Sequence, residues 1–252
     1  MGRDVTSARI AWSFLTRLPG GAHPGPSDSM ASAVPWFPVV GLVLGAGLGA
    51  VYLGLFEITS PTVAALATIG LGALATGAFH EDGLADTFDA FGGYEPEQRL
   101  EIMRDSRIGT FGTLALVVAT GLKVAGLASL DGADGLVALV VAHSAARATA
   151  LLVMRAGPDA RTEGLAASAT DLPRTAVAGV VAVTALAGVG LGPVTAIAVA
   201  ALLGVAVGAV RVARRRFGGT TGDVLGAVEQ VSEIVVLLVC AELVGELGWL
   251  WG

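Results

Sequence analysis

Acidic residues in segment 80–109 gather at a spacing that could hold a metal ion. Asp82, Asp86 and Asp89 follow an i, i+4, i+7 pattern, which on a helix places three carboxylates within about 60° of arc on one face. Three like charges so close repel one another unless a cation lies between them. All-oxygen ligands favour Mg²⁺, which is commonly shared with a substrate phosphate. We therefore predict a magnesium site here, with Asp105 as a fourth ligand or a general base.

The spacing alone also fits a plain solvated acidic face on a loop helix. Against that interpretation, segment 80–109 directly continues an apolar run, and acids near a membrane span are costly and usually functional. A helix whose acids serve only solubility more often mixes Lys with them, and this segment contains no Lys. The metal site is the interpretation that we prefer.

Basic residues follow the acidic helix. Arg104 and Arg107 carry guanidinium groups that can contact a phosphate with two hydrogen bonds each. Gly109 and Gly112 open the next apolar run, and the free N–H groups at the start of a helix also favour an anion. Taken alone, the two arginines are equally well explained as topology anchors. Beside three carboxylates, a phosphate clamp is the better interpretation.

Residues 218–223, Gly-Gly-Thr-Thr-Gly-Asp, form a second polar cluster. A glycine-rich turn can present backbone N–H groups to phosphate, although the Lys of a P-loop is missing here. Because this turn falls on the same side of the membrane as the acidic helix, we expect Thr221, Gly222 and Asp223 to complete the site from its second side.

His143 and Arg147 lie four residues apart within an apolar run, so on a helix they share a face. An arginine inside a membrane needs a carboxylate partner or a water-filled cavity. A structural ion pair and a contact with substrate both remain open for Arg147.

Composition identifies a membrane protein. The 252 residues are 54% hydrophobic and only 14% charged, whereas soluble domains carry about 25% charged residues. So few charges cannot cover a soluble core of this size. A net charge of −6, with 14 Arg and one Lys, argues against a nucleic-acid partner. The single Cys240 excludes a disulfide framework and a cysteine metal site.

We predict an all-α, polytopic helical bundle in the lipid bilayer, a single domain over residues 1–252 with about seven transmembrane helices, six to eight at the limits. The apolar run 175–210 would be about 54 Å long as one helix, so we divide it at the breaker 190–193. The predicted spans are 37–56, 61–79, 110–130, 135–154, the two halves of 175–210, and 231–250.

Positive residues orient these spans. With the N-terminus in the cytoplasm, 13 of the 15 Lys and Arg residues fall in inner segments, as the positive-inside rule requires. The acidic helix then faces the cytoplasm from the inner membrane. The inner segments are 1–36, 80–109, 155–174 and 211–230.

These motifs resemble, along most of the chain, the cobalamin (5′-phosphate) synthases, which are the adenosylcobinamide-GDP ribazoletransferases. The sequence departs from the family pattern at Glu81, where an apolar residue is expected, and at Ala90, where a Gly is expected. The matching segments are 14–19, 36–41, 80–93, 102–112 and 219–227.

The resemblance implies a Mg²⁺-dependent transferase of the inner membrane. It would join α-ribazole or α-ribazole 5′-phosphate to adenosylcobinamide-GDP and release GMP, a step that depends on positioning and charge neutralisation. The expected catalytic and metal-binding residues are Asp82, Asp86, Asp89 and Asp105. The expected substrate-binding residues are His80, Arg104, Arg107, Arg147, Thr221, Gly222 and Asp223.

Two other functions compete with this one. A phosphotransferase of the CDP-alcohol type also has an Asp-rich helix, but its pattern D-x2-D-G-x2-A-R is not present in this sequence. A secondary transporter would show repeated broken helices with ionisable groups at mid-membrane, and only one broken run, 190–193, is found. The sequence leaves open whether the chain forms a homo-oligomer.

Overall fold

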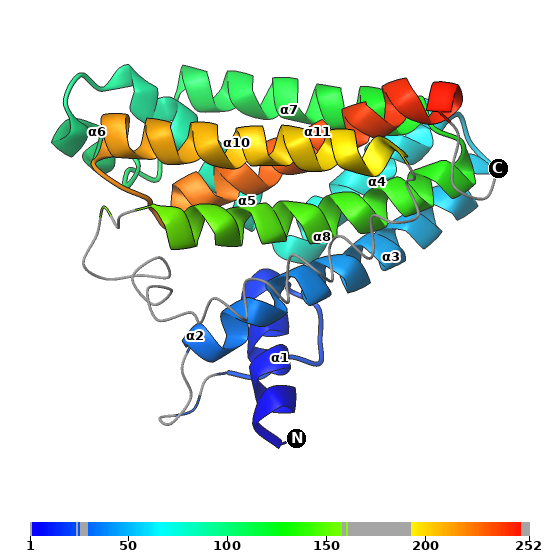
Figure 1. The fold of residues 1–252 in the computed structure, drawn as a ribbon, viewed down its shortest axis with the longest axis horizontal. Helices are drawn as coiled ribbons and strands as arrows, with labels where there is room; N and C mark the ends of the chain where they lie inside the picture. Colours follow the sequence, from blue (N-terminus) through cyan, green and yellow to red (C-terminus); the bar gives the residue numbers. More distant parts are fainter. Residues whose placement is uncertain (1, 24, 26–29, 158–159, 161–192, 248–252) are drawn as a thin grey trace.

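The computed structural model describes residues 2–23, 25, 30–157, 160 and 193–247, and over these residues the regular elements are helices. The long helices lie side by side, while the N-terminal helices project from one side of the bundle (Figure 1). The elements are α1 (Gly2–Leu15), α2 (Met30–Ala33), η1 (Val34–Trp36), α3 (Phe37–Phe56), α4 (Pro61–Thr76), α5 (Phe79–Asp89), η2 (Ala90–Gly92), α6 (Pro96–Ile102), α7 (Thr110–Ala128), α8 (Gly132–Ala156), α10 (Pro193–Phe217) and α11 (Gly222–Leu247).

The predicted all-α membrane bundle is confirmed. Five helical stretches are long and apolar enough to cross a membrane, and α4 together with the bent segment Phe79–Gly92 forms a sixth candidate. The described part of α10 starts at Pro193, and residues 190–192 of the predicted break lie outside the described residues. The first half of the run 175–210, our seventh span, lies almost entirely outside the described residues.

The last span begins earlier than we predicted. We expected it to start at residue 231, but α11 begins at Gly222. Thr221 caps this helix, because its Oγ1 accepts a hydrogen bond from Val224 N at 3.2 Å. Two glutamates in the first half of this helix, Glu229 and Glu233, are buried inside the bundle.

A sharp turn separates α4 from the acidic helix α5. Gly77 has φ +70° and Ala78 has φ +55°, so two consecutive residues are left-handed and the α-helix stops. The two helices meet at 92°. We had expected the acidic segment simply to continue the span, and instead it turns to pack along α11.

The contact between α3 and α8 depends on glycines. A Cβ atom at Gly45 would lie 2.5 Å from the Leu139 carbonyl oxygen, and one at Gly41 or Gly49 would also collide with α8. Such small residues let two membrane helices approach closely. This contact holds α8, which carries His143 and Arg147, firmly within the bundle.

We predict that Gly45→Leu destabilises the protein, because the larger side chain must push α3 away from α8. Overpacking of this kind costs about 1–3 kcal/mol, so the midpoint of thermal unfolding in detergent should fall by several degrees. Gly47→Leu is the matched control, since a Cβ there meets nothing within 4 Å. Equal midpoints for the two variants would contradict the close α3–α8 contact.

Candidate functional site

The acidic helix has the geometry that the sequence predicts. Asp82, Asp86 and Asp89 lie on α5, which spans Phe79–Asp89, so their spacing places them on one face. Asp82 is exposed, and Asp86 and Asp89 are half-buried. Oxygen donors on a solvent-accessible helix face are compatible with Mg²⁺, which retains part of its water shell.

Asp89 also caps the next membrane helix. Its Oδ2 accepts a hydrogen bond from Gly109 N at 2.7 Å, and its Oδ1 accepts one from Gly112 N at 2.8 Å. A Cβ at Gly109 would come within 2.5 Å of this carboxylate, so glycine is needed there. We had expected these amides to favour a substrate anion, but they bind the anion of Asp89 instead.

The loop between α6 and α7 holds Asp105 and Arg107 as a pair. Arg107 Nη2 lies 2.5 Å from Asp105 Oδ2, and Arg107 Nε donates to both carboxylate oxygens. These hydrogen bonds lower the pKa of Asp105 to about 2. A carboxylate with so low a pKa is a poor general base near neutral pH, so positioning Arg107 or binding a metal suits it better. Arg104, in the same loop, is exposed.

The glycine-rich turn lies directly against the acidic helix. A Cβ at Gly83 would be 2.8 Å from the carbonyl oxygen of Asp223, so α5 and the start of α11 touch through their backbones. Thr221 is buried and serves as the helix cap, whereas Gly222 is exposed. The structure therefore brings together the two segments that the sequence analysis placed on opposite sides of one site.

Buried ion pairs connect helices α8 and α11. Arg147 Nη1 lies 2.7 Å from Glu229 Oε1 and 3.5 Å from Glu233 Oε1. All three side chains are at most 4% exposed. His143 pairs with the same Glu233 oxygen, and His80 of α5 lies 3.6 Å from Glu229. The carboxylate partner that an intramembrane arginine requires is thus supplied by α11.

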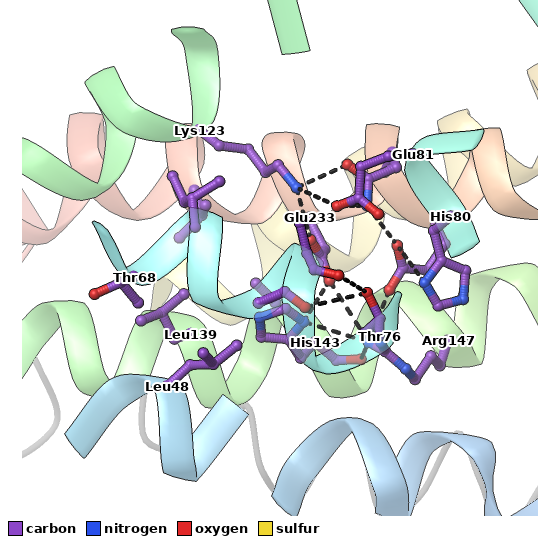
Figure 2. A pocket seen from close by; sticks show the side chains of 17 residues that line it. Leu48, Thr68, Thr76, His80, Glu81, Lys123, Leu139, His143, Arg147 and Glu233 are labelled. Carbon is purple, nitrogen blue, oxygen red and sulfur yellow. Dashed lines mark hydrogen bonds and ion pairs between the residues drawn. The ribbon is translucent and has the colours of Figure 1, made fainter. Parts of the chain in front are cut away.

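Lys123 of α7 extends this network to a fourth helix (Figure 2). Its Nζ donates to Gln230 Oε1 at 2.7 Å and to Glu233 Oε2 at 3.3 Å, and it lies 3.8 Å from Glu81 Oε1. Gln230 in turn donates to Glu81. Glu81, which departs from the expected family pattern, therefore belongs to the same network of ionisable side chains.

Sequence reasoning noted most of these residues without grouping them. The usable signal was the recurrence of ionisable residues at i, i+4 in apolar helices, His143 with Arg147 and Glu229 with Glu233. One oxygen or nitrogen from each of His143, Glu229 and Glu233 lies within 4.8 Å of the others, as in a metal site. Because Arg147 already supplies positive charge to both glutamates, we assign these residues to an ion-pair network.

We predict that Asp89→Ala lowers stability by about 0.5–2 kcal/mol, the usual cost of losing a helix cap. Asp82→Ala is the matched control, because Asp82 lies on the same face but is exposed. Thermal unfolding in detergent measures both variants. If Asp82→Ala proves as destabilising as Asp89→Ala, the capping role is wrong.

Arg147→Met should be far more disruptive, since it leaves buried carboxylates without a counter-charge. Breaking a buried ion pair costs about 3–5 kcal/mol, and the yield of folded protein in detergent should fall with it. Adding Glu229→Gln to this variant should restore much of the loss. Arg211→Met, on the exposed surface of α10, should leave stability unchanged. The pairing would be refuted by a double variant that is no more stable than Arg147→Met.

Comparison with known proteins identifies the family. Residues 7–241 match the family model described as cobalamin-5-phosphate synthase. A relative named adenosylcobinamide-GDP ribazoletransferase from Bradyrhizobium diazoefficiens is 45% identical over 248 residues, covering 94% of both chains. Proteins of the same name from Ralstonia nicotianae and Allorhizobium ampelinum are 42% and 43% identical, over 91% and 89% of this chain and 92% of each relative. No solved structure matches. The chain is therefore a member of the cobalamin-5-phosphate synthase family.

Proposed function

We propose that this chain joins adenosylcobinamide-GDP to α-ribazole, or to α-ribazole 5′-phosphate, and releases GMP. The observation that carries the proposal is the contact of the acidic helix α5 with the glycine-rich turn before α11, in a chain of this family. In the reaction, a ribazole hydroxyl oxygen forms a bond to the phosphorus that bears the cobinamide side chain. The bond from that phosphorus to the bridging oxygen breaks, GMP leaves with this oxygen, and the hydroxyl proton is released.

Asp82, Asp86 and Asp89 would hold Mg²⁺, with Asp105 as a further ligand. The donor set suits this ion, because it is made only of carboxylate oxygens on an accessible face. Each Asp89 oxygen accepts one backbone hydrogen bond and keeps a second lone pair for a ligand. When bound, Mg²⁺ supplies positive charge to the pyrophosphate and to the leaving oxygen.

The protein's own groups would position the substrates. Arg104 and Arg107 present exposed guanidinium groups in a loop that Asp89 fastens to α5 through Gly109. Asp105 holds Arg107 in one orientation through its hydrogen bonds. These arginines would bind phosphate oxygens. Gly222 and Asp223 would contact the substrates from the α11 side of the site.

We further propose that this site faces the cytoplasm from the inner membrane. Arg99 of α6 donates to Arg216 O at 3.1 Å, and Arg214 donates to Ala156 O at 2.9 Å. The ends of α6, α8 and α10 therefore meet at one end of the bundle, which is also where α7 and α11 begin (Figure 1). Arginine-rich ends of this kind stay on the inner side.

Purified protein should form a corrinoid product and GMP from adenosylcobinamide-GDP and α-ribazole when Mg²⁺ is present, and a chelator should abolish both. Asp82→Asn and Asp86→Asn should each lower turnover at least 100-fold, because they remove charge that binds the metal. Glu97→Gln on the exposed surface of α6 is the control for loss of an acid. Full activity in both Asp variants would refute the metal site. Absence of product from a folded preparation with either acceptor would refute the proposed reaction.

A further inference from the structure

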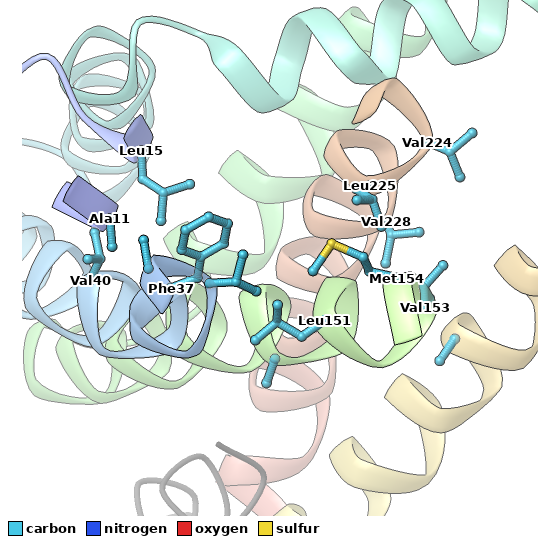
Figure 3. Close-up of a cluster of buried hydrophobic side chains, with 14 of the residues drawn as sticks. Ala11, Leu15, Phe37, Val40, Leu151, Val153, Met154, Val224, Leu225 and Val228 are labelled. Carbon is cyan, nitrogen blue, oxygen red and sulfur yellow. The ribbon is translucent and has the colours of Figure 1, made fainter. Parts of the chain in front are cut away.

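An apolar pocket lies at the junction of α1, α3, α5, α8 and α11. About 520 Å³ between its walls, counting the open side, is free of protein atoms. A mostly apolar lining with a few polar groups is typical of small-molecule sites. Figure 3 shows several wall residues, with Leu15 and Phe37 facing Leu151 and Met154. The apolar side chains that line it include Phe14, Phe37, Phe79, Leu151, Met154 and Leu225.

Three aromatic rings shape one part of this pocket. Phe14 and Phe37 are stacked, with centroids 5.6 Å apart and planes at 10°. Phe79 meets Phe14 edge-on at 5.2 Å. Aromatic faces and edges at such angles favour contact with another flat aromatic ring. The expected ligand group is therefore planar and mostly apolar.

The pocket shares residues with both segments of the proposed site. Phe79 precedes Asp82 by three residues on α5, and residues so spaced lie on the same helix face. On α11 the pocket is lined by Gly222, the neighbour of Asp223. A molecule held in the pocket would thus extend towards the acidic face and the glycine-rich turn.

Buried polar groups line the same pocket. Arg147 and Glu229 are 2% and 1% exposed, and both contribute to its lining. Arg147 Nε is buried and has no hydrogen-bond acceptor among the described residues. A buried donor without an acceptor is costly, so a ligand with one suitably placed acceptor would be favoured.

We propose that this pocket binds the benzimidazole base of α-ribazole, an inference that rests on the proposed function. A benzimidazole riboside offers flat apolar rings with a single acceptor nitrogen, which Arg147 Nε can satisfy. Guanine, in the other substrate, is also bicyclic but carries several donors and acceptors along its edge. The polar groups in the lining, His80, Arg147 and Glu229, already pair with one another, so most of the guanine groups would stay unpaired, which is costly for buried groups. The pocket therefore favours the base of α-ribazole over the guanine of adenosylcobinamide-GDP.

Filling the pocket tests the proposal. Ala150 lines it, and Ala150→Phe should raise KM for α-ribazole at least tenfold while KM for adenosylcobinamide-GDP changes less than twofold. Ala156→Phe is the matched control, because Ala156 lies on the same helix and is exposed outside the pocket. If Ala150→Phe fails to fold, Phe37→Leu, which removes a ring but keeps an apolar side chain, should raise the same KM several-fold. An equal rise for both substrates, or a rise for adenosylcobinamide-GDP alone, would overturn the pocket assignment.

A binding measurement without turnover separates this proposal from the reaction itself. Equilibrium dialysis of 5,6-dimethylbenzimidazole against the detergent-purified full chain should show saturable binding that Ala150→Phe weakens at least tenfold and Ala156→Phe preserves. Saturable binding with this pattern in a protein that forms no product would support the pocket and refute the reaction. Product formation with no such binding, or with binding unchanged by Ala150→Phe, would refute the assignment of this pocket to the base and leave the proposed reaction standing. The pocket would then be assigned to a lipid chain.

Discussion

The buried pairing of Arg147 and Lys123 with three glutamates is the constraint on which the bundle depends. Taking a carboxylate out of water into an apolar bundle costs several kcal/mol unless a close counter-charge and hydrogen bonds compensate it. Here Arg147 compensates Glu229 and Glu233, and Lys123 lies between Glu233 and Glu81. Since these groups come from α5, α7, α8 and α11, the four helices can each occupy only one register relative to the others.

The same constraint fixes the acidic helix. Its first turn carries Glu81, which is joined to the network through Gln230 and Lys123. Gly83 packs against the backbone of α11, and Asp89 closes the far end by capping α7. Because α5 is held at both ends, the helix face that carries Asp82, Asp86 and Asp89 has a fixed orientation. The left-handed turn at Gly77 makes this placement possible, because a straight continuation of α4 would carry the helix away from α11.

Apolar packing, charge pairing and helix capping therefore position different parts of the bundle. Glycines bring α3 close to α8, and α8 carries Arg147 and Leu151, which both line the apolar pocket. Polar capping by Asp89 and Thr221 sets where α7 and α11 begin. The first turns of α7 and α11 lie next to the acidic helix α5. The proposed site is therefore built from helix ends, and the buried ion pairs inside the bundle hold these ends in place.

The sequence by itself determined the features that depend on near neighbours along the chain. Apolar runs identified most membrane helices, and the spacing of Asp82, Asp86 and Asp89 defined a shared face. An intramembrane Arg147 required either a carboxylate partner or a water-filled cavity. Only the tertiary structure decided which groups meet across helices. Lys123 donates a hydrogen bond to Gln230, 107 residues away in the sequence. Asp89 accepts hydrogen bonds from Gly109 and Gly112 across a loop. Helical periodicity sets the direction of a side chain within its own helix. Which side chain it meets depends on how helices cross and turn, as at Gly77, and that is set by the packing of the whole bundle.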